Sequence, residues 1–252
     1  MAIDRTAFNA LVDDTGDNLT GTVLTKAVVE TVLLDPMDAA LALGGFGGDL
    51  NPEAHDAAIL APVNADFSWV NQGSATIRDD TSSVVLVGAA AGNVSAAVQA
   101  RVKAAPATPY VITVYVTPLM TLKAYQQYGL LFRESASGAL HALAVIGFGT
   151  NPYGVLAINS SKLTSPTAGA GDYLSVQPLA MGAPRWLRIA DDGTDRVLSV
   201  SADGVDWLVV HTVGRTDFLT TGANQVGFFV STVNLATPNY APILRVSSWK
   251  ET

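Results

Sequence analysis

Residues 186–211 read WLRIADDGTDRVLSVSADGVDWLVVH. Three short apolar segments in this stretch are separated by two Asp-Gly pairs, Asp192-Gly193 and Asp203-Gly204. An Asp-Gly pair between alternating apolar residues is a strong hairpin signal, because glycine adopts a positive φ without steric cost. The stretch therefore predicts a three-stranded antiparallel meander.

The same pattern extends through the chain from about residue 64. About fourteen candidate strands follow one another, and turn residues separate nearly all of them. Examples of such turns are Asn71-Gln72-Gly73 and Asp79-Asp80. Because no long helical pattern intervenes, parallel βαβ units are not expected, and residues 64–252 are predicted to form one antiparallel sandwich of two sheets.

The composition excludes several classes of partner. The 252 residues include 14 Lys and Arg against 22 Asp and Glu, which gives a net charge of −8. Nucleic acid is not an expected partner, because phosphate binding needs a basic face. Membrane insertion is not expected either, since no apolar run approaches the ~20 residues of a membrane span. The chain has no cysteine, so disulfides and thiolate metal sites are excluded.

The first 48 residues differ from the rest. Apolar residues at helical spacing predict helices over 22–34 and 36–43, and the glycine-rich Gly44–Gly48 follows as a joint. We expect an attachment and oligomerisation segment over 1–48, a linker over 49–63 and the sandwich over 64–252. The first helix is apolar on more than one face, so it packs either against its own domain or on another subunit or partner. The N-terminus lacks the pattern of a signal peptide, which predicts synthesis in the cytoplasm.

Six segments of the sandwich region carry a family resemblance through their residues and their order. They are Phe67–Gly73, Tyr128–Glu134, Trp186–Ile189, Ser201–Trp207, Gln225–Phe229 and Ser247–Trp249. The ordered set resembles the concanavalin-A-like (laminin-G-like) lectin and glucanase superfamily. This resemblance covers about residues 64–250 and implies a mainly β fold, an antiparallel jelly-roll β-sandwich.

A second resemblance lies near the N-terminus. Leu11–Gly16, Gly21–Ala27 and Asp38–Leu41 are similar to leader segments of tailed-bacteriophage virion proteins. In those proteins such segments are associated with fibres, spikes and baseplate-type parts. The resemblance implies a homo-oligomeric virion component that binds other virion proteins through its N-terminal helix and carries a lectin-like domain outward.

The acids and histidines do not predict an enzyme. Glucanases of the superfamily place Glu-x-Asp-x-x-Glu on one strand; that motif is absent, and Glu134 is the only Glu between residues 54 and 250. Asp191 and Asp192 are an alternative acid pair, but adjacent acids in a hairpin are typical, solvated turn formers. His141 and His211 are expected at strand ends, at the surface or partly packed. No Gly-x-Ser-x-Gly motif accompanies the histidines.

No metal or cofactor is expected. The superfamily resemblance makes Ca²⁺ a possible ligand, because several aspartates of the two hairpin turns carry suitable oxygens. Turn formation explains these aspartates without an ion. They are Asp191, Asp192, Asp195, Asp203 and Asp206.

The glycan-binding candidates lie in loops. The four tryptophans fall in predicted strands and are expected in the core. Pro-stiffened loops offer tyrosine rings beside asparagine amides, which suits glycan binding. These loop candidates are Asn151, Tyr153, Asn239, Tyr240 and Tyr125.

The sequence thus predicts a non-enzymatic fibre, spike or decoration protein whose lectin-like domain contacts host surface glycan. Two alternatives remain open. One is a purely structural virion or baseplate protein that binds only other virion proteins, and the other is a glycan-degrading spike.

Overall fold

A computed structural model describes most of the sandwich region. The residues that it describes are 60–89, 97–119, 122, 126–148, 155–166, 172–178, 183–232 and 241–252. The helices expected over 22–34 and 36–43, and the N-terminal attachment segment as a whole, lie outside the described residues. Among the residues described, no helix is both long and apolar enough to span a bilayer.

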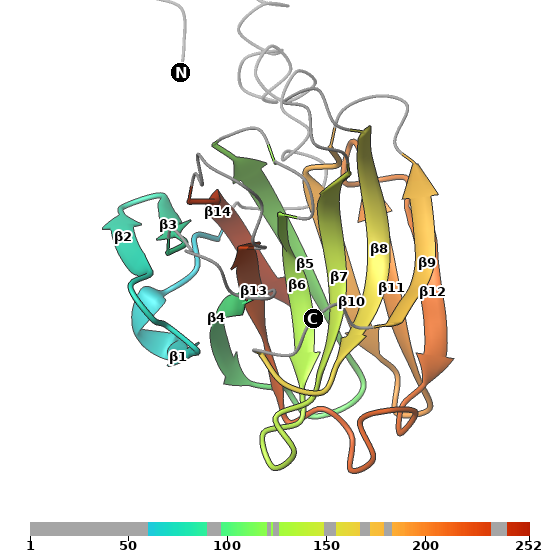
Figure 1. Ribbon diagram of the computed structural model, residues 1–252. Coiled ribbons are helices and arrows are strands. Elements are labelled where there is room, and N and C mark those ends of the chain that lie inside the picture. Colours follow the sequence, from blue (N-terminus) through green and yellow to red (C-terminus); the bar gives the residue numbers. More distant parts are fainter. Residues whose placement is uncertain are drawn as a thin grey trace, which may run out of the picture. The chain divides into compact units, whose positions relative to one another are not determined.

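The described residues form two antiparallel sheets of seven strands each, which face one another (Figure 1). Sheet A has the order β1-β4-β13-β6-β7-β8-β9 and sheet B the order β12-β11-β10-β5-β14-β3-β2. The strands of sheet A are β1 (Ser68–Val70), β4 (Ala97–Ala104), β13 (Gln225–Thr232), β6 (Gln127–Arg133), β7 (Leu140–Phe148), β8 (Val155–Leu163) and β9 (Asp172–Pro178). Those of sheet B are β12 (Leu208–Gly214), β11 (Asp195–Ser201), β10 (Trp186–Asp191), β5 (Tyr110–Pro118), β14 (Ile243–Glu251), β3 (Ser83–Val87) and β2 (Thr76–Asp80).

This arrangement confirms the predicted mainly β architecture with two antiparallel sheets. The one helical element in the described ranges is the 3₁₀ turn Asn64–Asp66. The meander predicted from residues 186–211 is present, since β11 pairs with β10 on one side and with β12 on the other.

The two Asp-Gly turns form as the sequence predicts. Gly193 has a φ of 94° and Gly204 a φ of 83°. In the first turn the Asp192 carboxylate accepts hydrogen bonds from the backbone N–H groups of Thr194 and Asp195, both at 2.7 Å. This capping satisfies the turn amides and fixes the hairpin register.

The core lies between the two sheets and follows from strand alternation. In β5 every second residue from Tyr110 to Val116 faces the core, and in β10 the core residues are Leu187 and Ile189. Phe67, Phe228 and Trp249 form an edge-to-face aromatic group, with the Phe67 and Trp249 centroids 5.0 Å apart. Because side chains alternate along a strand, the residues between these core positions face outward from the sandwich.

Several connections leave the sandwich at one end, the loop end. In sheet B the last residue of β5 pairs with the start of β14, at Pro118 and Leu244. In sheet A the first residue of β6 pairs with Ser231, near the end of β13, and with Ile146, near the end of β7. The two sheets are in contact at this end. Gly88 follows β3 of sheet B, and a Cβ on Gly88 would lie 2.9 Å from a methyl group of Val230 in β13 of sheet A.

Candidate functional site

The strands that flank the glycan-binding candidates have their facing ends at the loop end. Asn151, Tyr153, Asn239, Tyr240 and Tyr125 themselves lie outside the described residues. The flanking strands are β7 and β8, β13 and β14, and β5 and β6. The topology brings these six strand ends to the same end of the sandwich, although they are distant in sequence.

The residues that follow Tyr125 are buried. They are Gln126, Gln127 and Tyr128. Tyr128 faces the core, and burial raises the pKa of its hydroxyl above the ordinary value of 10. Because β6 begins at Gln127, Gln127 and Tyr128 belong to sheet A and not to the loop.

The outer side of sheet B carries aromatic rings and guanidinium groups near the loop end. Tyr115 of β5 and Trp186 of β10 are directly paired across the strands, with ring centroids 4.9 Å apart. The Arg185 guanidinium donates to the Tyr115 hydroxyl at 3.1 Å. The Arg188 guanidinium carbon lies 3.5 Å from the centroid of the Trp207 ring. We call these five residues the aromatic–arginine cluster.

The loop between β11 and β12 packs onto this cluster. A Cβ on Gly204 would lie 2.9 Å from the Trp186 ring, so glycine permits both the turn and the close contact. The Trp207 Nε1–H donates to the Gly204 carbonyl at 3.1 Å. The loop is held by Asp203, whose carboxylate accepts from the backbone N–H groups of Val205 and Asp206, both at 2.9 Å. These bonds lower the pKa of Asp203 to about 2.

The same loop leaves an apolar surface exposed. Trp207 is half-buried, Val205 is 53% exposed and Leu208 is 59% exposed. Leu208 pairs with Val200 of the core, so it lies on the inner side of sheet B, whereas the Trp207 ring lies against Arg188 on the outer side. We call Trp207 and Val205 the Trp207 platform. Exposed apolar groups that share one loop mark interaction surfaces more often than isolated ones do.

The tryptophans therefore occupy three different environments, and the expectation that all four lie in the core is wrong. Trp249 faces the core and Trp69 packs against its edge. Trp186 is buried on the outer side of sheet B, beside Tyr115. Trp207 precedes β12 and is not in a strand. Composition and spacing do not distinguish these cases, because one residue of register decides the face to which a side chain points.

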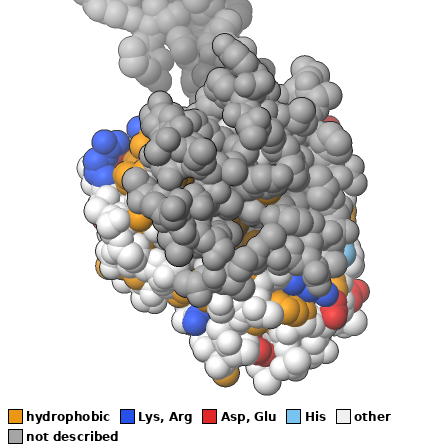
Figure 2. Space-filling view, in the orientation of Figure 1, with side chains coloured by type: hydrophobic (Ala, Val, Ile, Leu, Met, Phe, Trp, Pro, Cys, Tyr) orange, Lys and Arg blue, Asp and Glu red, His pale blue; other side chains and the backbone are white. Residues whose placement is uncertain are grey.

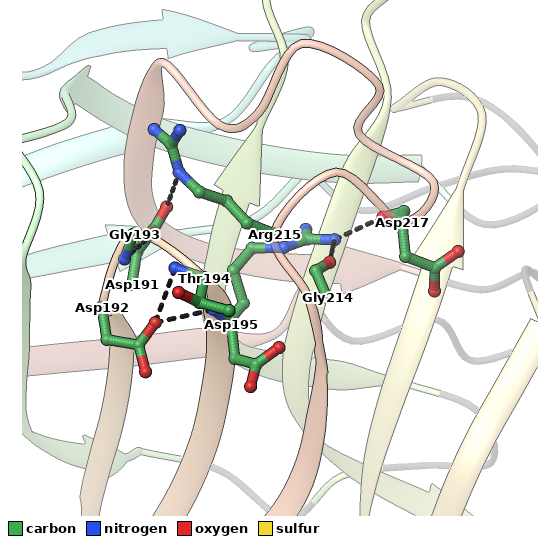
Figure 3. Close-up of polar contacts among 9 residues, drawn as sticks. Asp191, Asp192, Gly193, Thr194, Asp195, Gly214, Arg215 and Asp217 are labelled. Atoms are coloured by element: carbon green, nitrogen blue, oxygen red, sulfur yellow. Dashed lines mark hydrogen bonds and ion pairs between the residues drawn. The ribbon is translucent and has the colours of Figure 1, made fainter.

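At the end of the sandwich opposite the loop end, acidic and basic side chains form ion pairs and hydrogen bonds that stabilise the fold. Figure 3 shows Arg215 reaching Asp191, where Nε and Oδ2 are 3.0 Å apart. Asp191 is fully buried and also accepts from the Gly193 N–H at 3.0 Å. Asp191 is therefore not the solvated turn former that we expected, whereas Asp192 does cap the turn. Figure 2 shows basic, acidic and histidine side chains near one another at the right of the view, the side of β9 and β12 in Figure 1.

His141 and Arg196 lie inside this polar end. Both are fully buried, and the Arg196 guanidinium donates to the backbone carbonyl of Asp217. Burial, with Arg196 and His211 nearby, lowers the pKa of His141 to about 2, so this imidazole is neutral. The expected surface or partly packed position is wrong for His141, because it faces inward beside Phe132 of β6. The described residues contain no group of His, Asp and Glu arranged to hold a metal ion.

Glu134 also accepts several hydrogen bonds at this end of the sandwich. Its carboxylate accepts from the Thr221 N–H and hydroxyl, both at 2.6 Å, and from the Ser137 hydroxyl. These hydrogen bonds lower the pKa of Glu134 to about 2. A general acid for glycoside cleavage needs a raised pKa, so the environment of Glu134 is the reverse of what that role requires.

Comparisons with known proteins show similarity of fold. No protein-family model and no curated protein matches the chain. A Saccharomyces cerevisiae protein of unknown function has a similar structure, with a TM-score of 0.52, 15% identity, and coverage of 76% of this chain and 98% of that one.

Two carbohydrate-binding modules are more distantly similar. Carbohydrate-binding module CBM66 from Bacillus subtilis gives a TM-score of 0.43 at 8% identity, over 77% of this chain and 99% of that one. The CBM2 module of the evolved Dit protein of Lactobacillus casei BL23 phage J-1 gives 0.42 at 10% identity, over 79% and 81% of the two chains. At these identities the likeness concerns the β-sandwich alone.

Proposed function

We propose that this protein is a non-enzymatic glycan-binding β-sandwich of the concanavalin-A-like type, and that it is a fibre, spike or decoration component of a phage-type virion. The glycan role rests mainly on one observation. The Trp207 platform exposes part of an indole and the Val205 side chain at the loop end, and the Arg188 guanidinium supports the indole from one side.

The chemistry of the platform suits a sugar. A pyranose ring presents C–H groups on its faces and hydroxyl groups around its edge, so it needs an apolar surface bordered by hydrogen-bonding groups. Trp207 and Val205 supply the apolar surface. Arg188 is held on the indole and also donates from Nε to the Thr113 hydroxyl at 3.0 Å, so its position is set before a ligand arrives.

The state of the carboxylates supports a binding role rather than hydrolysis. Hydrogen bonds from backbone and hydroxyl groups lower the pKa values of Glu134 and Asp203 to about 2. The alternative acid pair is also engaged, because Asp191 is paired with Arg215 and Asp192 caps its turn. Each of these acids has a structural task that needs the charged form.

The virion role rests on the resemblance of Leu11–Gly16, Gly21–Ala27 and Asp38–Leu41 to leader segments of phage virion proteins. In this proposal the N-terminal segment binds other virion proteins and subunits of the same kind. Mass spectrometry of particles purified from the producing cells tests it, since a virion component co-purifies at constant stoichiometry. Its loss from particles on a density gradient would contradict the virion role.

A glycan array with the full-length protein tests the binding role. Trp207→Ala should weaken binding to every glycan that the wild type binds, by about tenfold or more, as expected for a central aromatic residue. Val63→Ala is the matched control, because Val63 is an exposed apolar residue (60%) outside the platform. Equal losses in both variants would contradict a specific role for Trp207.

Two further variants separate the platform from the loops. Tyr153→Ala and Tyr240→Ala remove the predicted loop rings. Loss of binding in these variants with full retention in Trp207→Ala would move the site to the connecting loops. If the wild type binds no glycan and no host cell, the purely structural virion protein becomes the better proposal.

A further inference from the structure

Four of the described strands lie at sheet edges, and three of these edges carry features that discourage pairing with another chain. β1 has only three residues, Ser68–Val70. Three of the five residues of β2 are charged, and β9 begins with Asp172 and ends with Pro178. Short length, charge and proline each protect the unpaired backbone groups of an edge strand.

The fourth edge strand, β12, has none of these three features. It is the outermost strand of sheet B (Figure 1) and reads LVVHTVG over Leu208–Gly214. β12 pairs with β11 on one side, and no described strand pairs with its other side. A bulge in the pairing with β11 lies between Val209 and His211, and the extra residue, Val210, faces the core. The strand therefore presents seven residues without Lys, Arg, Asp, Glu or Pro at a sheet edge.

The start of this edge exposes apolar side chains on both sides of the sheet. Leu208 lies on the inner side, and Val209, the next residue, lies on the outer side. Leu208 is 59% exposed and Val209 is 54% exposed. Exposed apolar side chains on an edge strand without charges are typical of a site where another strand pairs.

We propose that β12 pairs antiparallel with β12 of a second copy of this chain, so that the two B sheets join into one. The absence of charge favours a second copy as the occupant. A two-fold axis places the strand opposite itself, and a charge on β12 would then lie near the same charge of the other copy. A strand of a different protein could instead match a charged edge with opposite charges, so it would not require a neutral one.

The charges around β12 are compatible with this pairing. His211 is the one titratable side chain of the strand, and burial lowers its pKa, so it is neutral at pH 7. Asp206 precedes the strand, and Arg215 and Asp217 follow it. Arg215 and Asp217 already have ion-pair partners within the chain. Because antiparallel pairing brings the start of one strand to the end of the other, Asp206 comes near Arg215 of the second copy and not near its own counterpart.

The geometry of an antiparallel pair fixes two properties of the dimer. The two-fold axis is perpendicular to the joined sheet, so the outer sides of both copies face the same way. Trp207 precedes β12 in each copy, so the two Trp207 platforms lie on one side, roughly 25 Å apart, at opposite ends of the paired strands. A single pair of edge strands buries less than the ~1,200 Å² of a standard interface, and we therefore expect a reversible dimer.

Sedimentation velocity of the full-length protein between about 1 and 200 μM tests the pairing. The mass of the wild type should double across this range. Val209→Lys adds a charge at the edge, and this variant should keep the mass that it has at the lowest concentration. Val63→Lys is the matched control, because Val63 is 60% exposed and lies outside β12, and it should behave as the wild type does. Each protein is compared with itself at low concentration, so association through another segment does not affect the result.

Cross-linking locates the contact. The chain has no cysteine, so a single-cysteine variant reacts at one position only. Thr212→Cys places a thiol on an exposed residue near the middle of β12, and Thr76→Cys places one on an exposed residue of the edge strand β2. A short bis-maleimide reagent at the highest protein concentration should convert most of Thr212→Cys, and little of Thr76→Cys, into a covalent dimer.

Several outcomes would overturn the inference. One is a wild-type mass that stays constant up to the highest concentration, and another is association of Val209→Lys equal to that of the wild type. Equal loss of association in both lysine variants, or equal cross-linking of both cysteine variants, would show that the contact lies elsewhere. Cross-linking of Thr212→Cys to a different protein in the producing cells, and not to itself, would assign the edge to another partner. If Val209→Lys fails to fold, as judged by far-UV circular dichroism, the two cysteine variants decide.

Discussion

Replacing Trp249 with alanine should be among the most destabilising single changes in the sandwich. The ring is 5% exposed and contacts Phe67 and Phe228 edge-to-face, with centroids 5.0 and 6.1 Å away. A buried tryptophan removes ~150–250 Å² from water, which at ~25 cal/mol/Å² corresponds to about 4–6 kcal/mol as an upper bound. Measured costs of large aromatic-to-alanine changes in cores are ~3–5 kcal/mol. We therefore expect a loss of about 4 kcal/mol.

Trp207→Ala is the matched comparison. Its ring is half-buried on the outer side of the sandwich, and its contacts are Arg188 and the Gly204 carbonyl. Solvent can fill the space that the ring leaves, so no cavity forms, and about half of the transfer energy is lost. We expect a cost of about 2 kcal/mol, half of that for Trp249→Ala.

Urea unfolding followed by far-UV circular dichroism measures both costs. Tryptophan fluorescence is less suitable, because each variant lacks one of the tryptophans that give the signal. The midpoints should shift with unchanged slopes if only stability changes. Equal costs for the two variants would show that Trp207 is a core residue and would refute its assignment to an exposed platform. A cost below ~2 kcal/mol for Trp249→Ala would refute its place at the centre of the inter-sheet core.

Three further predictions concern stability. Gly129→Ala should cost ~3 kcal/mol or more, because the added Cβ would lie 1.9 Å from a backbone oxygen of the neighbouring strand, whereas Gly214→Ala has open space and should cost ~1 kcal/mol or less in the same urea titration. Acid should destabilise the fold: the folded-state pKa values of Glu134 and Asp203 are about 2, below their ordinary values of 4.5 and 3.8, so their contribution is complete above about pH 5 and falls as the pH approaches 2. Melting temperatures that stay constant from pH 5 to pH 2 would contradict this. Arg215→Gln should cost about 2 kcal/mol, since it leaves a buried carboxylate without its ion-pair partner, and a melting temperature equal to that of the wild type would contradict it.

Local signals explain why the strands could be predicted from the sequence. The meander over 186–211 carries its own turn residues, and Gly193 and Gly204 adopt the positive φ that the hairpins need. Alternation in β5 likewise places Ile112 and Val114 in the core. These features depend on residues within one or two turns of the chain, so a single sequence contains the necessary information.

Features that depend on pairing between distant strands could not be predicted. His141 is the second residue of β7 and is expected at the surface from the sequence, yet it faces Phe132 and His211 inside the sandwich. Asp191 reads as a turn residue, yet its partner is Arg215, 24 positions away. Each assignment requires the register of two strands and the identity of the neighbouring loop, and the sequence does not state either one locally.

The outer side of sheet B illustrates the same limit. Thr113, Arg188 and Lys250 are separated by 75 and 62 positions along the chain, and only the order β14-β5-β10 places them side by side. Their spacing is set by backbone hydrogen bonds between strands whose inward sides form the core. Insertion of one residue into β5 before Thr113 should therefore be strongly destabilising, because it turns Thr113 and Tyr115 toward the core and separates Tyr115 from Trp186. The same urea titration measures this cost, and a midpoint equal to that of the wild type would contradict the register.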